Sequence, residues 1–261
     1  MKNNDNLIID PIHSSPNFNQ RIRYLVLHYT ALDFDNSLKT LTDPKREVSA
    51  HYLVPEASIE GERKVFQLVE DRKRAWHAGV SRWGTRTNIN DTSIGIEIVN
   101  LGYKDDKGKR YWYPYEEYQI ETVIALAKKI VDDYKIEPVN VIGHSDIAPG
   151  RKQDPGPLFP WKKLFENNIG AWFDEQQVAE KIRDIKKAIT INFHELQENL
   201  KTYGYPIEIT GKLDQQTRNV LQAFQMHFRQ NDISGEPDAE TVIILENLVQ
   251  KYFPNQFKKG Y

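Results

Sequence analysis

Short apolar runs separated by polar turns fill the first part of the chain, a pattern that predicts strands. The run 23–31 (RYLVLHYTA) is rich in Leu, Val and Tyr, as expected for a buried strand. Runs 49–54 and 64–69 predict two further strands joined by a turn, and 93–100 (SIGIEIVN) predicts a fourth. A last strand is predicted at 140–146, ending in a loop rich in glycine and proline.

An amphipathic helix is predicted between the last two strands, from Pro114 to Tyr134. Apolar side chains recur there at helical spacing and fall on one face, whereas the intervening Lys and Asp residues face water. The apolar positions are Val123, Leu126, Ala127, Ile130, Val131 and Tyr134. Strands combined with such a helix predict an α/β domain, a mixed central β-sheet flanked by helices, that closes near residue 170.

The last third of the chain shows helical spacing alone. After a predicted helix at 193–205, the motif G-x-x-D-x-x-T occurs at 211–217 and again at 235–241, each time before another helix. Asp214 and Asp238 in these motifs are suited to cap the helices, because a carboxylate accepts the free N–H groups of a first turn. A second, small three-helix domain is therefore predicted.

These patterns predict the following division of the chain. The α/β domain takes residues 1–173 and includes a polar approach segment at 1–20. A helical linker takes 174–188, and the three-helix domain takes 189–261.

Composition excludes several classes of protein. With 35 basic and 37 acidic residues the net charge is −2, which argues against a nucleic-acid binder that relies on a basic surface. The absence of cysteine excludes thiol catalysis and thiolate metal sites. The chain has no apolar run of the roughly 18 residues that a transmembrane helix needs. Its first residues also lack the apolar core of a signal peptide.

Three side chains are candidates for a metal site. His28 and His144 each lie near the end of a predicted strand, which is where ligand-binding and catalytic sites of α/β domains usually lie. Asp154 follows in the Gly/Pro-rich loop 143–157. Two imidazoles and a carboxylate are a typical ligand set of hydrolytic zinc enzymes. A histidine at a strand end is, however, more often a hydrogen-bonded structural residue, so both interpretations stay open from these residues alone.

Glu97 and Lys152 are candidates for acid–base and electrostatic chemistry. Glu97 lies between Ile96 and Ile98, and burial of a carboxylate is costly unless the group is paired or functional. Lys152 precedes Asp154 by two residues, so both side chains are expected on the same side of an extended segment. For Glu97 the alternative is a strand with one face exposed to water, and for Lys152 it is an ordinary solvated loop.

Four further residues are candidate substrate contacts: His51, Trp76, His77 and Asn88. Core or loop roles are equally compatible with the sequence at these positions. In the Gly/Pro-rich loop, Asp146 and Arg151 are expected to hold the loop in place without a catalytic role.

Five sequence blocks, taken in order, resemble the type 2 class of zinc-dependent N-acetylmuramoyl-L-alanine amidases, whose fold peptidoglycan recognition proteins share. The blocks are LVLHYTA, SAHYLV, RAWHAG, SIGIEIVN and VIGHSDIAPGRKQDPGP. The resemblance covers about residues 15 to 165. It implies that His28, His144 and Asp154 bind one zinc ion per chain, that Glu97 is the acidic catalytic residue and that Lys152 is the catalytic lysine. The activity implied is hydrolysis of the amide between N-acetylmuramic acid and L-alanine in peptidoglycan or muropeptides.

The helical domain is similar to peptidoglycan-binding domains of wall hydrolases, which predicts that it tethers the enzyme to its substrate. Together the two domains look most like the family member anchored to the outer membrane of enteric bacteria. This resemblance implies a monomer in the periplasm, with a lipidated N-terminus ahead of Met1 as one anchor. A cytoplasmic location is the alternative if no signal precedes Met1.

Two other functions fit a similar sequence. A non-catalytic peptidoglycan receptor of the same fold would have lost zinc ligands, and all three candidates are present here. A phage-type endolysin would perform the same reaction in another biological setting.

Overall fold

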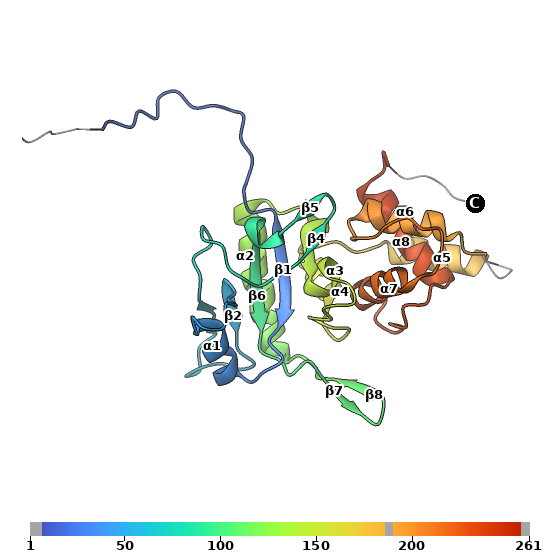
Figure 1. Cartoon of the computed structure of the whole chain (residues 1–261), viewed down its shortest axis with the longest axis horizontal. Coiled ribbons are helices and arrows are strands. Elements are labelled where there is room, and N and C mark those ends of the chain that lie inside the picture. Colours follow the sequence, from blue (N-terminus) through green and yellow to red (C-terminus); the bar gives the residue numbers. More distant parts are fainter. Residues whose placement is uncertain (1–6, 186–189, 257–261) are drawn as a thin grey trace, which may run out of the picture.

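The computed structural model describes residues 7–185 and 190–256. The start of the predicted approach segment (1–6), part of the predicted linker (186–188) and both ends of the predicted helical domain (189 and 257–261) lie outside the described residues. Figure 1 shows an α/β part built around a central sheet, beside a part made of helices.

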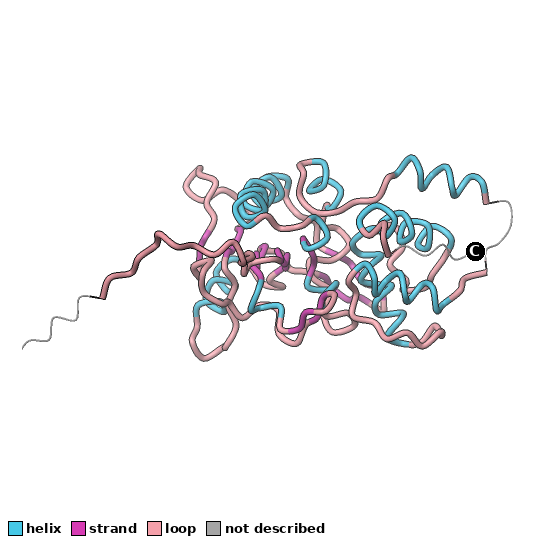
Figure 2. The backbone as a smooth tube through the Cα atoms, turned by 90° about the horizontal axis from the view of Figure 1, so that it is seen from above, coloured by secondary structure: helices cyan, strands magenta, loops and turns pink. Residues whose placement is uncertain are grey.

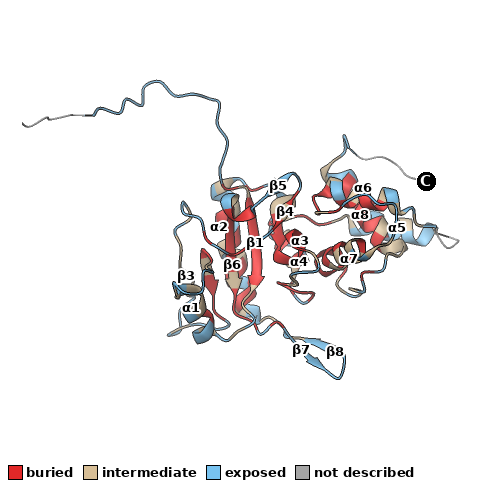
Figure 3. Ribbon diagram, viewed as in Figure 1, coloured by how far each residue is buried: buried red, intermediate tan, exposed pale blue. Residues whose placement is uncertain are grey.

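The central sheet has five strands, and the strand pairs β2–β6, β6–β1 and β1–β9 are parallel. Only β3, at one edge, pairs in the antiparallel direction. In sheet order the strands are β3 (Phe66–Gln67), β2 (Tyr52–Val54), β6 (Ser93–Ile98), β1 (Tyr24–Tyr29) and β9 (Val141–Gly143). Strands β1 and β6 are almost entirely buried (Figure 3), as their apolar sequences predict. All five predicted strands form, and the predicted mixed α/β fold is confirmed.

The prediction of a strand up to residue 146 is wrong beyond Gly143. The strand β9 ends there, and the short helix α3 (His144–Ile147) begins. The turn has a local cause: the Asp146 side chain reaches back and accepts the backbone N–H of Gly143 at 2.8 Å. His144 therefore projects from the first residue of a helix.

Helix α2 (Glu117–Tyr134) packs against β1 and β2. Its first helical residue lies three positions after the predicted start at Pro114. Its buried apolar residues are Ile120, Val123, Ala127 and Ile130. The apolar face predicted from helical spacing is thus the face that packs into the core. Figure 2 shows the backbone of the molecule from above, with helices around the strands.

Several short elements complete the α/β part. They are α1 (Phe34–Thr42), β4 (Arg82–Trp83), β5 (Arg86–Thr87), the 3₁₀ turns η1 (Ile89–Thr92) and η2 (Pro138–Asn140), β7 (Tyr103–Asp106), β8 (Lys109–Trp112) and α4 (Trp161–Glu166). The β7–β8 hairpin projects from the body of the molecule and is mostly exposed (Figures 1 and 3).

The helical part contains α5 (Glu175–Asp184), α6 (Phe193–Tyr203), α7 (Gln215–Phe228) and α8 (Ala239–Tyr252). Asp214 and Asp238 accept the backbone N–H groups of Thr217 and Thr241, so both predicted helix caps are confirmed. Helix α5 lies within the predicted linker and packs on α8, with Val178 buried. No helix among residues 7–185 and 190–256 is long and apolar enough to cross a membrane.

A single hydrophobic core runs through both parts of the molecule. The ring of Trp83 packs against Tyr205, with 4.9 Å between ring centroids. Trp161 stacks on His227 at 3.7 Å. The two parts therefore share buried surface in the folded chain.

Candidate active site

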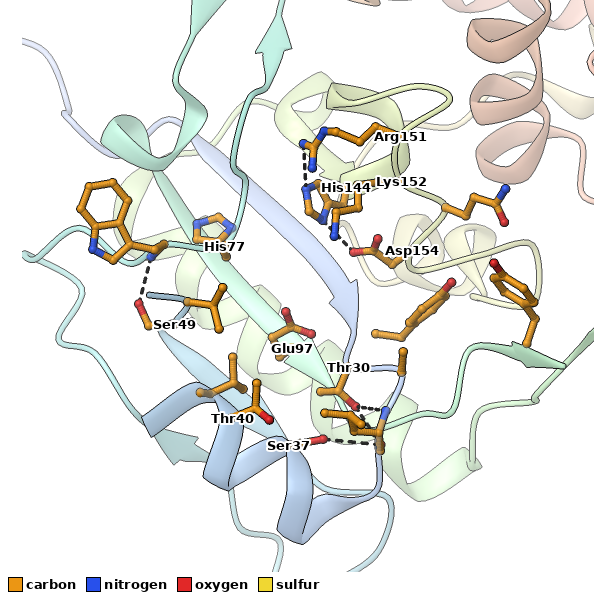
Figure 4. A pocket seen from close by; sticks show the side chains of 18 of the residues that line it. Thr30, Ser37, Thr40, Ser49, His77, Glu97, His144, Arg151, Lys152 and Asp154 are labelled. Carbon is orange, nitrogen blue, oxygen red and sulfur yellow. Dashed lines mark hydrogen bonds and ion pairs between the residues drawn. The ribbon is translucent and has the colours of Figure 1, made fainter. Parts of the chain in front are cut away.

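The carboxyl ends of β1, β6 and β9 bring the candidate residues together. Residue pairing sets His28 opposite Glu97 and Leu27 opposite Gly143, the residue before His144. Because the three strands are parallel, their ends meet at one edge of the sheet. The loop after α3 then returns Asp154 to the same edge (Figure 4).

The three candidate metal ligands converge at short range. The Nδ1 atoms of His28 and His144 are 3.0 Å apart. The Asp154 Oδ2 atom lies 2.8 Å from the first and 2.9 Å from the second. All three side chains are buried, at 1%, 4% and 6% exposure respectively. The structure thus joins residues that are 116 and 126 positions apart in the sequence.

The tautomer of His144 follows from its second ring nitrogen. Its Nε2 atom lies 3.1 Å from the Ala78 carbonyl oxygen, which can only accept a hydrogen bond. Nε2 must therefore carry the proton, and in the neutral ring Nδ1 is left with a lone pair directed at Asp154.

The tautomer of His28 is fixed by a chain of three hydrogen bonds. Ser93 donates its hydroxyl proton to the Ile89 carbonyl at 2.7 Å, so its oxygen accepts from His77 Nε2 at 3.1 Å. His77 Nδ1 is then free to accept from His28 Nε2 at 3.0 Å. Nδ1 of His28 is left without a proton, as at His144.

The cluster fits a bound cation. Each of His28, His144 and Asp154 offers one ligand atom, and these atoms lie within 4.8 Å of one another. The hydrogen bonds leave all three atoms without a proton, so nothing within the cluster offsets their mutual repulsion. A set of two imidazoles and one carboxylate matches the ligand sets of hydrolytic zinc sites.

Burial favours the protonation states that bind metal. Burial, and then the nearby charge of His144, lower the pKa of His28 to about 4. Burial likewise holds the pKa of His77 well below its ordinary value. For Asp154, burial raises the pKa, whereas positive charge and hydrogen bonds from His144 and His28 lower it; with both Nδ1 atoms unprotonated, a bound cation would take over that stabilisation of the carboxylate.

Glu97 lies beside this cluster on β6. Its Oε2 atom is buried and has no hydrogen-bond partner among the described residues. Burial is the main cause that raises its pKa well above the ordinary range, Asp154 adds to the shift, and Lys152 opposes it. A carboxyl group with a free buried oxygen and a raised pKa is suited to take up and release a proton.

A cavity of about 590 Å³ opens over these groups. Glu97, Lys152, His144 and Asp154 all line it, and Figure 4 shows Glu97 between His77 and Asp154. Its size suits a small-molecule substrate or part of a larger one.

The four candidate substrate contacts fall in different places. Trp76 and His77 line the cavity, and Trp76 is half exposed. His51 does not line the cavity. It is fully buried, its Nδ1 accepts the Gly95 N–H, and its Nε2 bonds the Lys73 carbonyl. Asn88 is exposed and lines two other pockets, one of which it shares with Trp76. The geometry gives substrate contact no support at the buried His51, whereas substrate contact at Asn88 stays a prediction.

Two residues that hold the site were not singled out in the sequence. Asn90 accepts the backbone N–H groups of His77 and Ala78 at 3.0 and 2.8 Å, and Ser93 ends the chain of bonds from His28. Ser93 lies four positions before Glu97 on the same face of β6, and this alternation is the signal that could have found it. Arg151 donates to the Ala78 and Val80 carbonyls, in line with its expected loop-holding role.

Comparison with known proteins agrees with this geometry. Residues 18–157 match the family profile of N-acetylmuramoyl-L-alanine amidase, and residues 192–245 match that of a peptidoglycan binding domain. The chain is 47% identical over 234 residues to N-acetylmuramoyl-L-alanine amidase AmiD of Escherichia coli K12, covering 89% of this chain and 84% of that protein.

Two solved structures are similar over nearly the whole chain. The complex of E. coli AmiD with anhydro-N-acetylmuramic acid-L-Ala-D-gamma-Glu-L-Lys has a TM-score of 0.87 at 46% identity, covering 94% of this chain and 95% of that one. AmpDh3 of Pseudomonas aeruginosa with anhydromuramic pentapeptide has a TM-score of 0.86 at 45% identity, covering 94% and 99%. The chain therefore belongs to the N-acetylmuramoyl-L-alanine amidase family and is an amidase that carries a peptidoglycan binding domain.

Proposed function

We propose that this amidase is zinc-dependent, with one ion held by His28, His144 and Asp154. The observation that carries the proposal is the convergence of three buried, proton-free ligand atoms beside the unpartnered oxygen of Glu97. When bound, zinc supplies a Lewis acid and makes a water nucleophile available at neutral pH.

Glu97 acts as the proton carrier. It takes a proton from the attacking water as the new C–O bond forms, and it returns that proton to the nitrogen when the C–N bond breaks. The remaining water proton is lost when the new carboxylic acid ionises, so the products are the lactyl carboxylate of the sugar and the free amino group of L-alanine. Its buried oxygen and raised pKa support this role.

Lys152 stabilises the negative charge that develops on the carbonyl oxygen. It lines the same cavity as Glu97, and its charge lowers the pKa of that group, which places a positive field at the reacting centre. A donor of this kind typically contributes about 3–4 kcal/mol to the transition state. Trp76 and His77 form part of the cavity wall against which substrate lies.

Muropeptides with an anhydro-muramic end are the proposed soluble substrate, because the complexes of two similar enzymes hold such molecules. The helical domain is proposed to bind peptidoglycan, as its family match suggests. A monomer acting in the periplasm, as inferred from the sequence resemblance, completes the proposal.

Removal and return of zinc tests the cofactor. Chelator treatment is expected to abolish release of stem peptides from purified muropeptides, measured by mass spectrometry, and added zinc is expected to restore it. Asp154→Ala and His144→Ala are expected to lose zinc, measured by elemental analysis. His194→Ala is the matched control, because that histidine is exposed in the helical domain. Full zinc content in Asp154→Ala would remove that residue from the ligand set.

Glu97→Gln separates proton transfer from metal binding. The substitution keeps the size of the side chain, so zinc content is expected to be unchanged. Turnover is expected to fall about 10²–10⁴-fold, the range for loss of a general acid–base group. Near-normal turnover with zinc bound would contradict the assigned role.

A further inference from the structure

The helical domain reaches the candidate zinc site through Asp146. This carboxylate is fully buried and accepts three hydrogen bonds. One comes from the Gly143 N–H, at 2.8 Å, and closes the first turn of α3. The other two come from the helical domain: Tyr205 donates its hydroxyl to Oδ1 at 2.8 Å, and His227 lies with Nδ1 2.8 Å from Oδ2.

Both donors are fixed by aromatic packing. The His227 ring stacks between Trp161, at 3.7 Å and 14°, and Phe228, at 4.0 Å and 12°. The Tyr205 ring meets Trp83 edge-on, with 4.9 Å between centroids. Packing of this kind limits the directions in which the two rings can offer their hydrogen bonds, so they can position the carboxylate that they contact.

Asp146 lies in the same short helix as His144. The two residues are the third and first positions of the four-residue helix α3, and the bond from Asp146 back to Gly143 closes around His144. A buried carboxylate that loses its donors must find new ones or reach water, which costs free energy. Any such movement of Asp146 would turn the helix that carries His144.

We propose that the helical domain is a working part of the active site, in which Tyr205 and His227 act as positioning residues for His144 through Asp146. The inference rests on the zinc site proposed above. It differs from the tether role of a wall-binding domain, because it concerns zinc binding and turnover on small soluble substrates.

The test uses the full-length protein and substitutions that remove only the donors. Tyr205→Phe deletes one hydroxyl, and His227→Phe keeps a flat ring between Trp161 and Phe228. Tyr252→Phe is the matched control. Its hydroxyl also joins the two parts of the chain, with 3.2 Å contacts to the backbone of Trp172, but it does not touch Asp146.

Three measurements separate positioning from general packing. Zinc affinity is measured by competition with a chromophoric chelator, ligand geometry by the visible spectrum of the cobalt-substituted protein, and stability by thermal unfolding. The double variant Tyr205→Phe/His227→Phe is expected to bind zinc about tenfold more weakly, the lower end for loss of supporting partners. Its cobalt spectrum is expected to change, and kcat on soluble muropeptide to fall with little change in KM.

Tyr252→Phe is expected to keep the zinc affinity, the cobalt spectrum and kcat. The proposal is overturned if the double variant matches Tyr252→Phe in zinc affinity and cobalt spectrum, whatever its loss of thermal stability. Failure of the zinc proposal is distinguishable from this result, because the unmodified protein would then bind no zinc.

Discussion

The imidazole rings of His28 and His144 are held in defined tautomers by partners of different kinds. A backbone carbonyl fixes His144 directly, whereas His28 depends on His77 and on the hydroxyl of Ser93 behind it. Both arrangements leave Nδ1 as the atom that faces the proposed zinc position. They require neutral rings, so the proton count of these residues is coupled to folding as well as to metal binding.

Because of the lowered pKa of His28, we expect the zinc-free protein to lose stability in mild acid. The pKa of His28 is lowered from 6.5 to about 4 in the folded state, so the unfolded state takes up its proton first as pH falls. The stabilising contribution is complete above pH 6.5 and is lost between there and about pH 4. Between pH 7 and pH 5 this one group should lower the free energy of unfolding by about 2 kcal/mol.

Urea unfolding of the chelator-treated protein at the two pH values measures this difference. The variant His28→Gln, which cannot titrate, should show a smaller dependence on pH. An equal dependence in both proteins would mean that His28 does not carry the effect.

Strand β6 contributes residues to the candidate site from one of its two faces. Ser93, Gly95 and Glu97 alternate along it: the first binds His77, the second leaves room for the His77 ring, and the third faces the cavity. A Cβ atom on Gly95 would lie 2.5 Å from Cγ of His77, closer than two non-bonded carbon atoms can approach. His77 can therefore occupy this position only because residue 95 is a glycine.

Gly95→Ala is accordingly expected to displace His77 and to break its bond to His28. Overpacking of this kind typically costs about 1–3 kcal/mol of stability. Because the tautomer support of His28 is lost as well, zinc affinity should fall together with stability. Ser93→Ala provides the comparison, since it breaks the same chain without a clash and should weaken zinc binding with a smaller loss of stability. Unchanged zinc affinity in both variants would show that His28 needs no support from His77.

The sequence allowed the strands, helix α2 and the candidate ligands to be predicted, because apolar periodicity and strand ends are local signals. It predicted a strand beyond Gly143, because the turn into α3 depends on how Asp146 folds back. The roles of Ser93 and Asn90 depend on which loop the fold brings beside them, which no spacing in the chain specifies. His51 was a reasonable candidate by residue type, yet the fold uses both its ring nitrogens within the core.

Over the whole molecule, the two parts of the chain meet through aromatic packing and directed hydrogen bonds. Trp83 and Trp161 of the α/β part contact rings of the helical part. Gln230 donates to the Phe159 carbonyl, and the Tyr252 hydroxyl accepts the backbone N–H of Trp172 at 3.2 Å. Separation of the parts would expose these rings and leave the buried Asp146 without two of its three donors.

This shared core predicts one cooperative unfolding transition, although two-domain chains often show two. Burial of each large aromatic side chain contributes about 1.5–3 kcal/mol, so separating the parts would remove a sizeable share of the roughly 5–15 kcal/mol that stabilises a typical folded protein. Scanning calorimetry of the zinc-loaded protein should give a single peak whose calorimetric and van't Hoff enthalpies agree. Trp83→Ala, which removes one of the shared contacts, should lower the temperature of that single peak. Two resolved peaks in the unmodified protein would instead mean that the helical part folds independently of the sheet.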